Sequence, residues 1–124
     1  MEFAGFVQPA VIHREYARAD AFVLPSLEDT FAVVAVEAMA SGVPVICSPF
    51  SGVSAYLTDG RDAFIVDPNN VGLLAERILG LLDDPLLQAR FRERGREIVQ
   101  RFEAETVAEV FAREILRIAR REIR

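Results

Sequence analysis

Residues 24–45 read LPSLEDTFAVVAVEAMASGVPV, and this stretch decides the fold of the 124-residue chain. It contains the end of an apolar strand, a turn with two carboxylates, an apolar helix and the start of a second strand. Glu37 is the only polar side chain in residues 31–40, FAVVAVEAMA. Because a helix that is apolar all round is normally buried, we expect Glu37 to lie in the core. A buried carboxylate costs several kcal/mol unless another group pairs with it, so Glu37 needs a partner.

Short apolar runs alternate with helical patterns along the first half of the chain, and the last third is helical throughout. The apolar runs are residues 2–7, 21–24, 43–47 and 63–66. This alternation predicts an α/β fold, in which a parallel sheet of about four strands is flanked by helices. In open sheets of this kind, ligands bind beyond the carboxyl ends of the strands. The binding rim is therefore expected to include Glu28, Asp29 and Ser51.

Composition narrows the classes of function. The chain is 52% hydrophobic, and its net charge of −5 argues against contact with nucleic acid or an anionic membrane. All 14 basic residues are arginines, which excludes a Schiff-base lysine in this chain. Cys47 is the single cysteine and is expected to be a buried core side chain. No apolar run approaches roughly 18 residues and no signal peptide is evident, so a cytoplasmic location is expected. The sequence predicts no metal site and no cofactor.

Asp29 and Glu37 are the candidate functional carboxylates. If the segment between them is helical, they lie about 12 Å apart along the axis and about 80° apart around it. This spacing suits an elongated ligand better than a single reacting atom. Glu37 could accept hydrogen bonds from vicinal hydroxyl groups, while Asp29 or the adjacent Glu28 meets a second polar group. The backbone N–H groups near residues 31–34 would form a helix N-terminus, which can bind phosphate.

The same residues also fit purely structural roles. Glu37 can pair inside the protein with Arg14 or Arg18. Asp29 is a good residue type for capping the helix that follows it. Glu28 is expected to be solvated. Chemistry alone therefore leaves the function open.

Residues 25–46, PSLEDTFAVVAVEAMASGVPVI, resemble the signature of the retaining GT-B glycosyltransferases of family 4, also called group 1. That signature reads roughly P-S-x-x-E-x-F-G, four residues, then E-A-[MF]-A-x-G-x-P-V. The likeness continues through residues 48–70, where the family has a Gly-Gly loop and a glycine-containing turn, and on into the C-terminal helices. It covers nearly the whole chain and is far more specific than a lone glycine motif.

The resemblance implies a Rossmann-like C-terminal domain that binds a nucleotide-sugar donor, linked to UDP or GDP. Glu37 takes the place of the glutamate that holds the ribose hydroxyl groups. Asp29 takes the place of the glutamate that approaches the donor sugar, with Glu28 beside it as a possible substitute.

Two backbone segments complete the donor site that the resemblance implies. The first meets the sugar and phosphate, and here it consists of Phe31, Ala32 and Val33. The second is the family's Gly-Gly loop, which holds Ser51 and Gly52 in this chain.

Five positions depart from the donor-facing pattern of the family. Asp29 is one methylene shorter than the usual glutamate, and the methyl group of Ala32 could obstruct close approach of the donor. The remaining departures are Ser51 and Ala63 in place of glycines and Ala55 in place of an acidic residue. These differences favour an altered donor choice or a lost activity.

By the resemblance, residues 1–124 form a single domain that is only part of an enzyme. The N-terminal acceptor domain and the first βα units, with their basic pair for the diphosphate, would be absent, so the chain should be inactive alone. The missing half or a partner subunit would then complete the site. Two alternatives are a non-catalytic nucleotide- or sugar-binding module and a domain that forms a homo-oligomer through an unpaired sheet edge.

Overall fold

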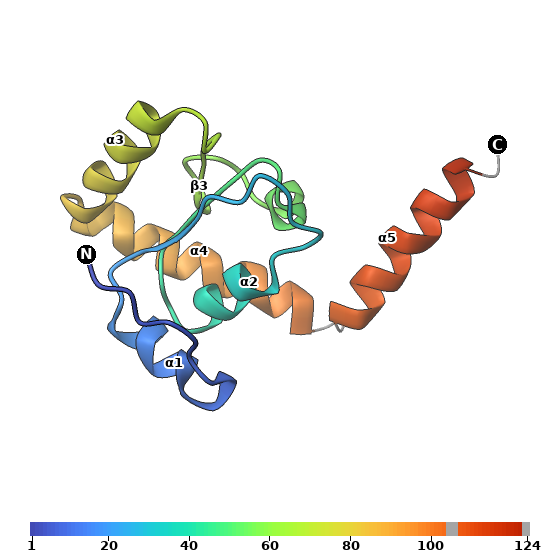
Figure 1. The fold of residues 1–124 in the computed structure, drawn as a ribbon, viewed down its shortest axis with the longest axis horizontal. Coiled ribbons are helices and arrows are strands. Elements are labelled where there is room, and N and C mark those ends of the chain that lie inside the picture. The colour runs from blue at the N-terminus through green and yellow to red at the C-terminus, as the bar shows by residue number, and fades with distance from the viewer. Residues whose placement is uncertain (104–106, 123–124) are drawn as a thin grey trace.

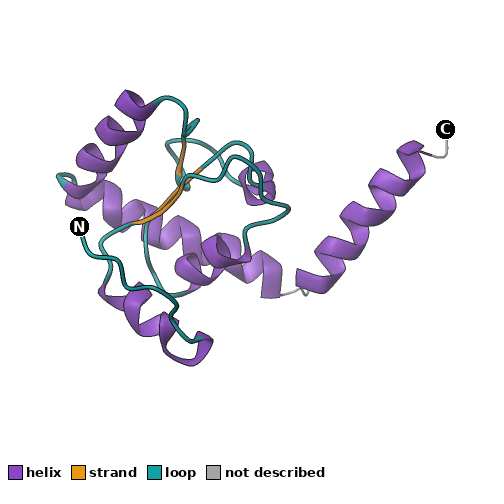
Figure 2. Ribbon diagram, in the orientation of Figure 1, coloured by secondary structure: helices purple, strands orange, loops and turns teal. Residues whose placement is uncertain are grey.

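The computed structural model describes residues 1–103 and 107–122. Its three strands are β1 (Phe22–Leu24), β2 (Val45–Cys47) and β3 (Phe64–Ile65), which form one parallel sheet in that order. Figure 2 shows the short strands at the centre, surrounded by helices. The predicted α/β fold with a parallel sheet is therefore confirmed. β2 is central and fully buried, whereas β1 is a half-buried edge strand.

The helices alternate with the strands and then fill the C-terminal part of the chain, as the sequence pattern predicts. A 3₁₀ turn, η1, lies between β2 and β3 (Figure 1). In chain order the helical elements are α1 (Pro9–Arg18), α2 (Val33–Ala40), η1 (Gly52–Tyr56), α3 (Val71–Leu82), α4 (Pro85–Glu103) and α5 (Val107–Glu122). No helix in the described part of the chain is long and apolar enough to cross a membrane.

The predicted strand at residues 2–7 is wrong, and the described residues form three strands where about four were expected. Phe3 and Phe6 are 86% and 88% exposed, and Gly5 between them has a φ of +68°, which interrupts an extended backbone. The run is apolar enough for a strand. However, it does not pair with β1, and an isolated strand leaves its backbone N–H and C=O groups without partners.

Each face of the sheet has its own apolar cluster, because successive side chains of a strand point to opposite faces. On one face, Ile46 and Phe64 pack with Leu81 of α3 and Phe91 of α4. The rings of Phe64 and Phe91 meet edge to face, with centroids 5.0 Å apart. On the other face, Cys47 packs with α2 and the end of α4. The expected burial of Cys47 is confirmed.

Gly42 ends α2 and directs the chain into β2. Its φ is +79°, a left-handed conformation that costs glycine little. The N–H of Gly42 donates to the carbonyl of Met39, and that of Val43 donates to the carbonyl of Ala38. These bonds satisfy carbonyl groups that the end of the helix would otherwise leave open. The positive φ of Gly42 and these two bonds therefore end α2.

Only one side of α2 lies in the core. Ala35 and Ala38 are fully buried, whereas Val33 and Val34 are 37% and 39% exposed. Glu37 is exposed on the same open side. The expectation that this apolar helix is buried all round, with Glu37 in the core, is therefore wrong. The sheet and α4 cover one side of α2, while on the other side α1 leaves a cavity beside Glu37.

Candidate functional site

Glu37 faces a cavity between α1 and α2, where its nearest polar partner is Tyr16 of α1. The Tyr16 hydroxyl donates a long hydrogen bond of 3.5 Å to Glu37 Oε2. Tyr16 is 6% exposed, and its ring packs edge to face on Phe22 with centroids 5.6 Å apart. Burial raises the pKa of the Tyr16 hydroxyl, and the adjacent Glu37 carboxylate raises it further. The hydroxyl therefore stays protonated and donates to the carboxylate.

The alternative of an internal arginine partner for Glu37 is not found among the residues that the structure describes. The ion pairs within that part of the chain join Arg94 to Asp62 and Glu97, and none joins Glu37 to Arg14 or Arg18. An exposed carboxylate can be solvated by water, so the energetic need for a cation disappears. Glu37 can accept hydrogen bonds from a ligand instead.

The cavity beside Glu37 has a volume of about 520 Å³, which is within the range of small-molecule pockets. Its walls are mostly apolar, with a few polar groups on the α1 and α2 sides. The lining residues are Val7, Pro9, Ile12, His13, Tyr16, Val34, Glu37, Ala40 and Ser41. Apolar walls with one carboxylate and one hydroxyl can hold a flat ring and orient the hydroxyl groups attached to it.

Asp29 lies in the loop before α2 and holds the backbone of that loop. Its Oδ1 atom accepts hydrogen bonds from the N–H of Phe31 at 3.2 Å and the N–H of Ala32 at 2.8 Å. Asp29 therefore has a structural role, but it does not cap α2 as the capping alternative supposed, because the N-cap of that helix is Ala32 and no side chain caps it. Because α2 begins only at Val33, the helical spacing assumed between Asp29 and Glu37 does not apply. Two of the N–H groups expected to bind phosphate are instead bonded to Asp29.

Two N–H groups at the N-terminal end of α2 have no hydrogen-bond partner in the part of the chain that the structure describes. Val33 and Val34 are the first residues of the helix, and no hydrogen bond within residues 1–103 and 107–122 uses their N–H groups. First-turn N–H groups have no partner inside a helix, and together they favour an anion. This end of α2 is therefore the part of the expected phosphate site that stays open.

The loop after β2 is bonded to the segment that contains Asp29. The N–H of Gly52 donates to the carbonyl of Asp29 at 3.1 Å, and the N–H of Val53 donates to the carbonyl of Phe31 at 2.9 Å. Ser51 is 2% exposed, and its hydroxyl donates to the carbonyl of Ser48 at 2.8 Å. The side chain of Ser51 thus serves the loop itself, and Gly52 brings the two backbones together.

Ala32 has a φ of +66° and is the only non-glycine residue with positive φ in the described part of the chain. The family pattern has glycine at this position, and the backbone explains why, since a left-handed conformation costs a residue with a Cβ atom about 1–2 kcal/mol. Ala32 is only 4% exposed and belongs to the apolar cluster on the α2 side. Its methyl group therefore lies in the core and away from the open surface where a ligand would approach.

We expect Ala32→Gly to change the free energy of unfolding by less than about 1 kcal/mol. Relief of the left-handed strain is offset by the lost burial of one methyl group and by the extra backbone freedom of glycine. Ala32→Val should destabilise by more than about 2 kcal/mol, since a β-branched residue tolerates positive φ poorly and overfills the core. Urea unfolding followed by circular dichroism measures both. Equal stability of the two variants would contradict the left-handed assignment.

The structure groups most of the predicted site residues at one place. Phe31 and Ala32 belong to the loop held by Asp29, and Ser51 and Gly52 lie against that loop.

The other two candidate carboxylates, Glu37 and Glu28, have surroundings that differ from those of Asp29. Glu37 faces the separate cavity between α1 and α2. Glu28 is exposed beside Asp29, so its expected solvation is confirmed. Sequence reasoning missed Tyr16 as a partner of Glu37. The available signal was its place in the apolar pattern of the segment that forms α1.

The chain is similar to known proteins in sequence and in fold. A family model described as glycosyl transferases group 1 matches residues 1–98. D-inositol 3-phosphate glycosyltransferase 2 from Catenulispora acidiphila is 36% identical over 104 residues, which are 81% of this chain and 24% of that protein. The chain therefore spans about a quarter of the length of that relative.

Two solved structures are similar to this chain at 26% sequence identity. One is the C-terminal domain of LpcC, a glycosyl transferase group 1 family protein from Francisella tularensis. Its similarity has a TM-score of 0.72 and covers 79% of this chain and 51% of that chain. HepE from Anabaena, solved in complex with UDP, has a TM-score of 0.70 and covers 82% of this chain and 29% of that chain. A nucleotide-bound protein is therefore among those with a similar fold.

Proposed function

The chain belongs to the group 1 glycosyltransferase family, and on this premise we propose that it is the donor-binding, C-terminal part of a retaining glycosyltransferase. The sequence resemblance to that family is confirmed. Our proposal adds that the donor is a sugar linked to UDP or GDP, that transfer proceeds with retention, and that this chain does not catalyse transfer alone.

The observation that carries the proposal is the position of the Glu37 carboxylate beside the cavity between α1 and α2. A ribose has two vicinal hydroxyl groups, and both can donate to one carboxylate in charge-assisted hydrogen bonds. The Tyr16 hydroxyl steadies the carboxylate from the opposite helix. A nucleobase can then pack against the apolar walls formed by Val7, Ile12 and Val34. The UDP complex of the similar protein HepE supports a nucleoside diphosphate as the ligand.

The diphosphate would extend from the ribose to the N-terminal end of α2, where the N–H groups of Val33 and Val34 are available. The sugar would then lie near the loop of Asp29. In this arrangement Asp29 Oδ1 fixes the N–H groups of Phe31 and Ala32. The second oxygen of Asp29 has no hydrogen bond within the described residues and can accept one from the donor sugar.

Activity would require more protein than this chain. A nucleoside diphosphate carries about two negative charges, and the chain has a net charge of −5, so cations must be supplied close to the phosphates. Among the described residues, no arginine lines the cavity beside Glu37. We propose that the remaining part of the enzyme, or a partner subunit, supplies these cations together with the acceptor site.

The open edge of β1 favours a self-associating module as the second candidate. β1 pairs with β2 on one side, and no strand among the described residues pairs with its other side. An unpaired edge can bind the edge of another molecule. A concentration-dependent dimer in light scattering, with no nucleotide binding, would favour this candidate over the first.

We expect titration calorimetry to detect saturable binding of UDP or GDP that Glu37→Ala weakens by about 10- to 100-fold. This range corresponds to about 1.5–3 kcal/mol for hydrogen bonds to a charged group. Glu76→Ala is the matched control, because Glu76 is an exposed carboxylate on α3 and does not line the cavity. Unchanged binding by Glu37→Ala would contradict the proposed role. If the parent chain binds neither nucleotide, the same titration is repeated on a protein that includes the N-terminal half. Binding by the longer protein would show that the site needs cations from that half, whereas no binding would show that there is no nucleotide site.

A further inference from the structure

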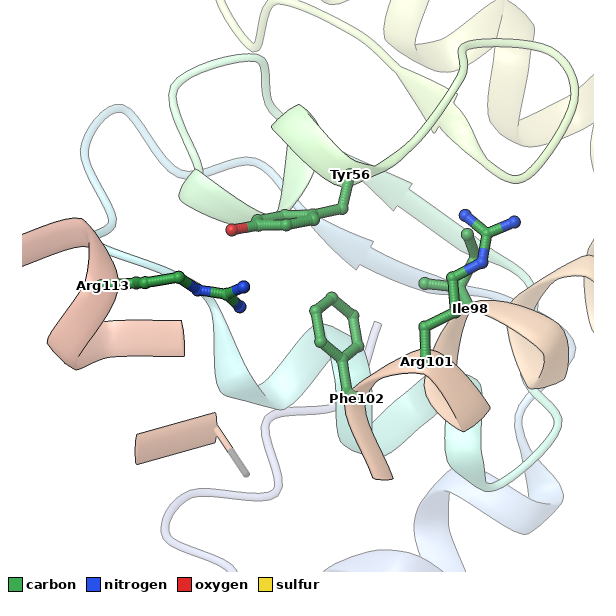
Figure 3. A pocket seen from close by; sticks show the side chains of 5 residues that line it. All are labelled: Tyr56, Ile98, Arg101, Phe102 and Arg113. Carbon is green, nitrogen blue, oxygen red and sulfur yellow. The ribbon is translucent and has the colours of Figure 1, made fainter. Parts of the chain in front are cut away.

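Two cavities of the structure differ in how their polar side chains are arranged. One has a volume of about 240 Å³ and lies between α4, α5 and η1. Figure 3 shows the Arg101 and Arg113 side chains of this cavity on opposite sides of the Phe102 ring, so they do not meet. In the cavity beside Glu37, by contrast, Tyr16 and Glu37 reach each other from two helices. That pair can therefore contact one part of a ligand together.

The ring of Tyr16 is fixed by its surroundings. Tyr16 is the buried residue of α1, and its ring packs edge to face on Phe22 of β1, with centroids 5.6 Å apart. The residue belongs to the apolar cluster on the α2 side and is also part of the cavity wall. Its hydroxyl is therefore held at a defined point of the cavity, which is what a ligand-binding group requires.

The contact between Tyr16 and Glu37 leaves hydrogen-bonding capacity on both groups. The Tyr16 hydroxyl donates to Glu37 Oε2 at 3.5 Å, whereas typical O–H···O bonds are about 2.7–2.8 Å long. A tyrosine hydroxyl accepts as well as donates, and an ionised carboxylate has about four acceptor positions. With its hydrogen directed to Glu37, the Tyr16 oxygen can accept a hydrogen bond from a ligand hydroxyl. A neighbouring ligand hydroxyl can donate to the carboxylate.

We infer, on the basis of the proposed function, that Tyr16 is a second ribose-binding residue, whose hydroxyl accepts a hydrogen bond from one ribose hydroxyl group while Glu37 accepts one from its neighbour. The bonds from the ligand through Tyr16 to Glu37 form a chain in which each bond strengthens the next. A sugar that lacks either hydroxyl group leaves one of the two residues without its partner, which costs affinity. The site therefore selects ribose over 2′-deoxyribose and 3′-deoxyribose.

Calorimetric titration with UDP and GDP, each compared with its 2′-deoxy and 3′-deoxy analogues, tests the role of Tyr16. The parent should bind the ribonucleotide about 3- to 10-fold more tightly than either analogue. In Tyr16→Phe the preference over one analogue should disappear, because its hydroxyl partner is gone, while the preference over the other analogue stays. A purely structural role of Tyr16 would change all these affinities by the same factor and leave both preferences as they are.

Tyr56→Phe is the matched control, because it removes the same hydroxyl group at a different place. Tyr56 lines the cavity of Figure 3 and not the cavity beside Glu37, so this variant should keep both preferences. Tyr16→Phe retains the ring that packs on Phe22. Urea unfolding checks that both variants fold.

NMR titration of the Tyr16 hydroxyl tests its contact with Glu37 without any ligand. Burial and the adjacent carboxylate raise the pKa of Tyr16, and His13 and Glu37 are the other titratable groups that line the cavity in the described part of the chain. In Glu37→Gln this pKa should fall, because the negative charge that disfavours the phenolate is gone. The chain has two tyrosines, so a Tyr56→Phe background leaves Tyr16 as the tyrosine that titrates. An unchanged pKa would overturn the inferred contact.

The role of Tyr16 and the proposed function fail on different results. Nucleotide binding that Glu37→Ala weakens, with both preferences unchanged in Tyr16→Phe, would overturn the role of Tyr16 and leave the proposed function intact. No binding of UDP or GDP, in the protein that includes the N-terminal half as well, would overturn both. Loss of one preference in Tyr16→Phe, with both kept in Tyr56→Phe, is the expected result.

Discussion

Replacing Gly52 with alanine is expected to lower the free energy of unfolding by more than about 4 kcal/mol, a large part of the roughly 5–15 kcal/mol that stabilises a native domain. A Cβ atom at Gly52 would lie 2.0 Å from the carbonyl oxygen of Thr30 and 3.0 Å from the Cα atom of Phe31. Both neighbours are backbone atoms, so no side-chain rotation can make room. The conflict is one of space, because Gly52 does not have a positive φ.

The strain at Gly52 can be relieved only if the loop moves away from the Asp29 segment. That movement breaks the hydrogen bonds from Gly52 to the Asp29 carbonyl and from Val53 to the Phe31 carbonyl. It also uncovers Val53, which is fully buried. The expected loss therefore combines a steric conflict, two backbone hydrogen bonds and part of the core.

Gly80→Ala provides the matched control for Gly52→Ala. Gly80 lies inside α3, and a Cβ atom there would meet nothing within 4 Å. Alanine should stabilise this helix by up to about 1 kcal/mol. Urea unfolding of the three proteins measures both changes. A Gly52→Ala variant that unfolds within about 1 kcal/mol of the parent would show that the loop does not lie against Thr30 as the structure describes.

Continuous apolar runs were enough to predict β1, β2 and β3, because such strands are buried and short. The same rule failed at residues 2–7, since apolar character gives no information on whether a neighbouring strand is present to pair with. The helix stop at Gly42 was predictable because a local backbone conformation requires it. A single sequence thus allows local backbone conformations to be predicted, but it does not show which distant segments pair with each other.

The candidate site shows the same division between local and long-range information. The residue type of Asp29 favours hydrogen bonds to nearby backbone N–H groups, and its bonds to Phe31 and Ala32 are local. The exposure of Glu37 depends on where α1 lies, which the sequence of α2 does not contain. The partner role of Tyr16 also depends on the packing of α1 on α2. Gly52 was assigned to a family loop, but its contact with Thr30 appears only in three dimensions.

The Cys47 thiol is expected to react with a thiol reagent on the order of a hundredfold more slowly in the native chain than in the unfolded chain at pH 8. Cys47 is 1% exposed at the end of β2, and burial raises the pKa of its thiol to about 11. An unfolded cysteine has a pKa near 8.5, so about a quarter of it is thiolate at pH 8, against about 0.1% in the native state. Steric protection by the core adds to this difference. Labelling with and without urea measures the ratio.

The same raised pKa gives the direction of a pH effect on stability. The folded chain favours the protonated thiol, so the contribution of Cys47 to stability is complete below a pH of about 8.5 and is lost as the pH rises toward 11. Cys47→Ala should remove this part of the pH dependence, which unfolding at several alkaline pH values can measure against the parent. Native labelling at the unfolded rate would contradict the buried position. Because β2 leads directly into the loop of Gly52, a Gly52→Ala variant that still folds should label faster than the parent, since opening of that loop uncovers the end of the strand.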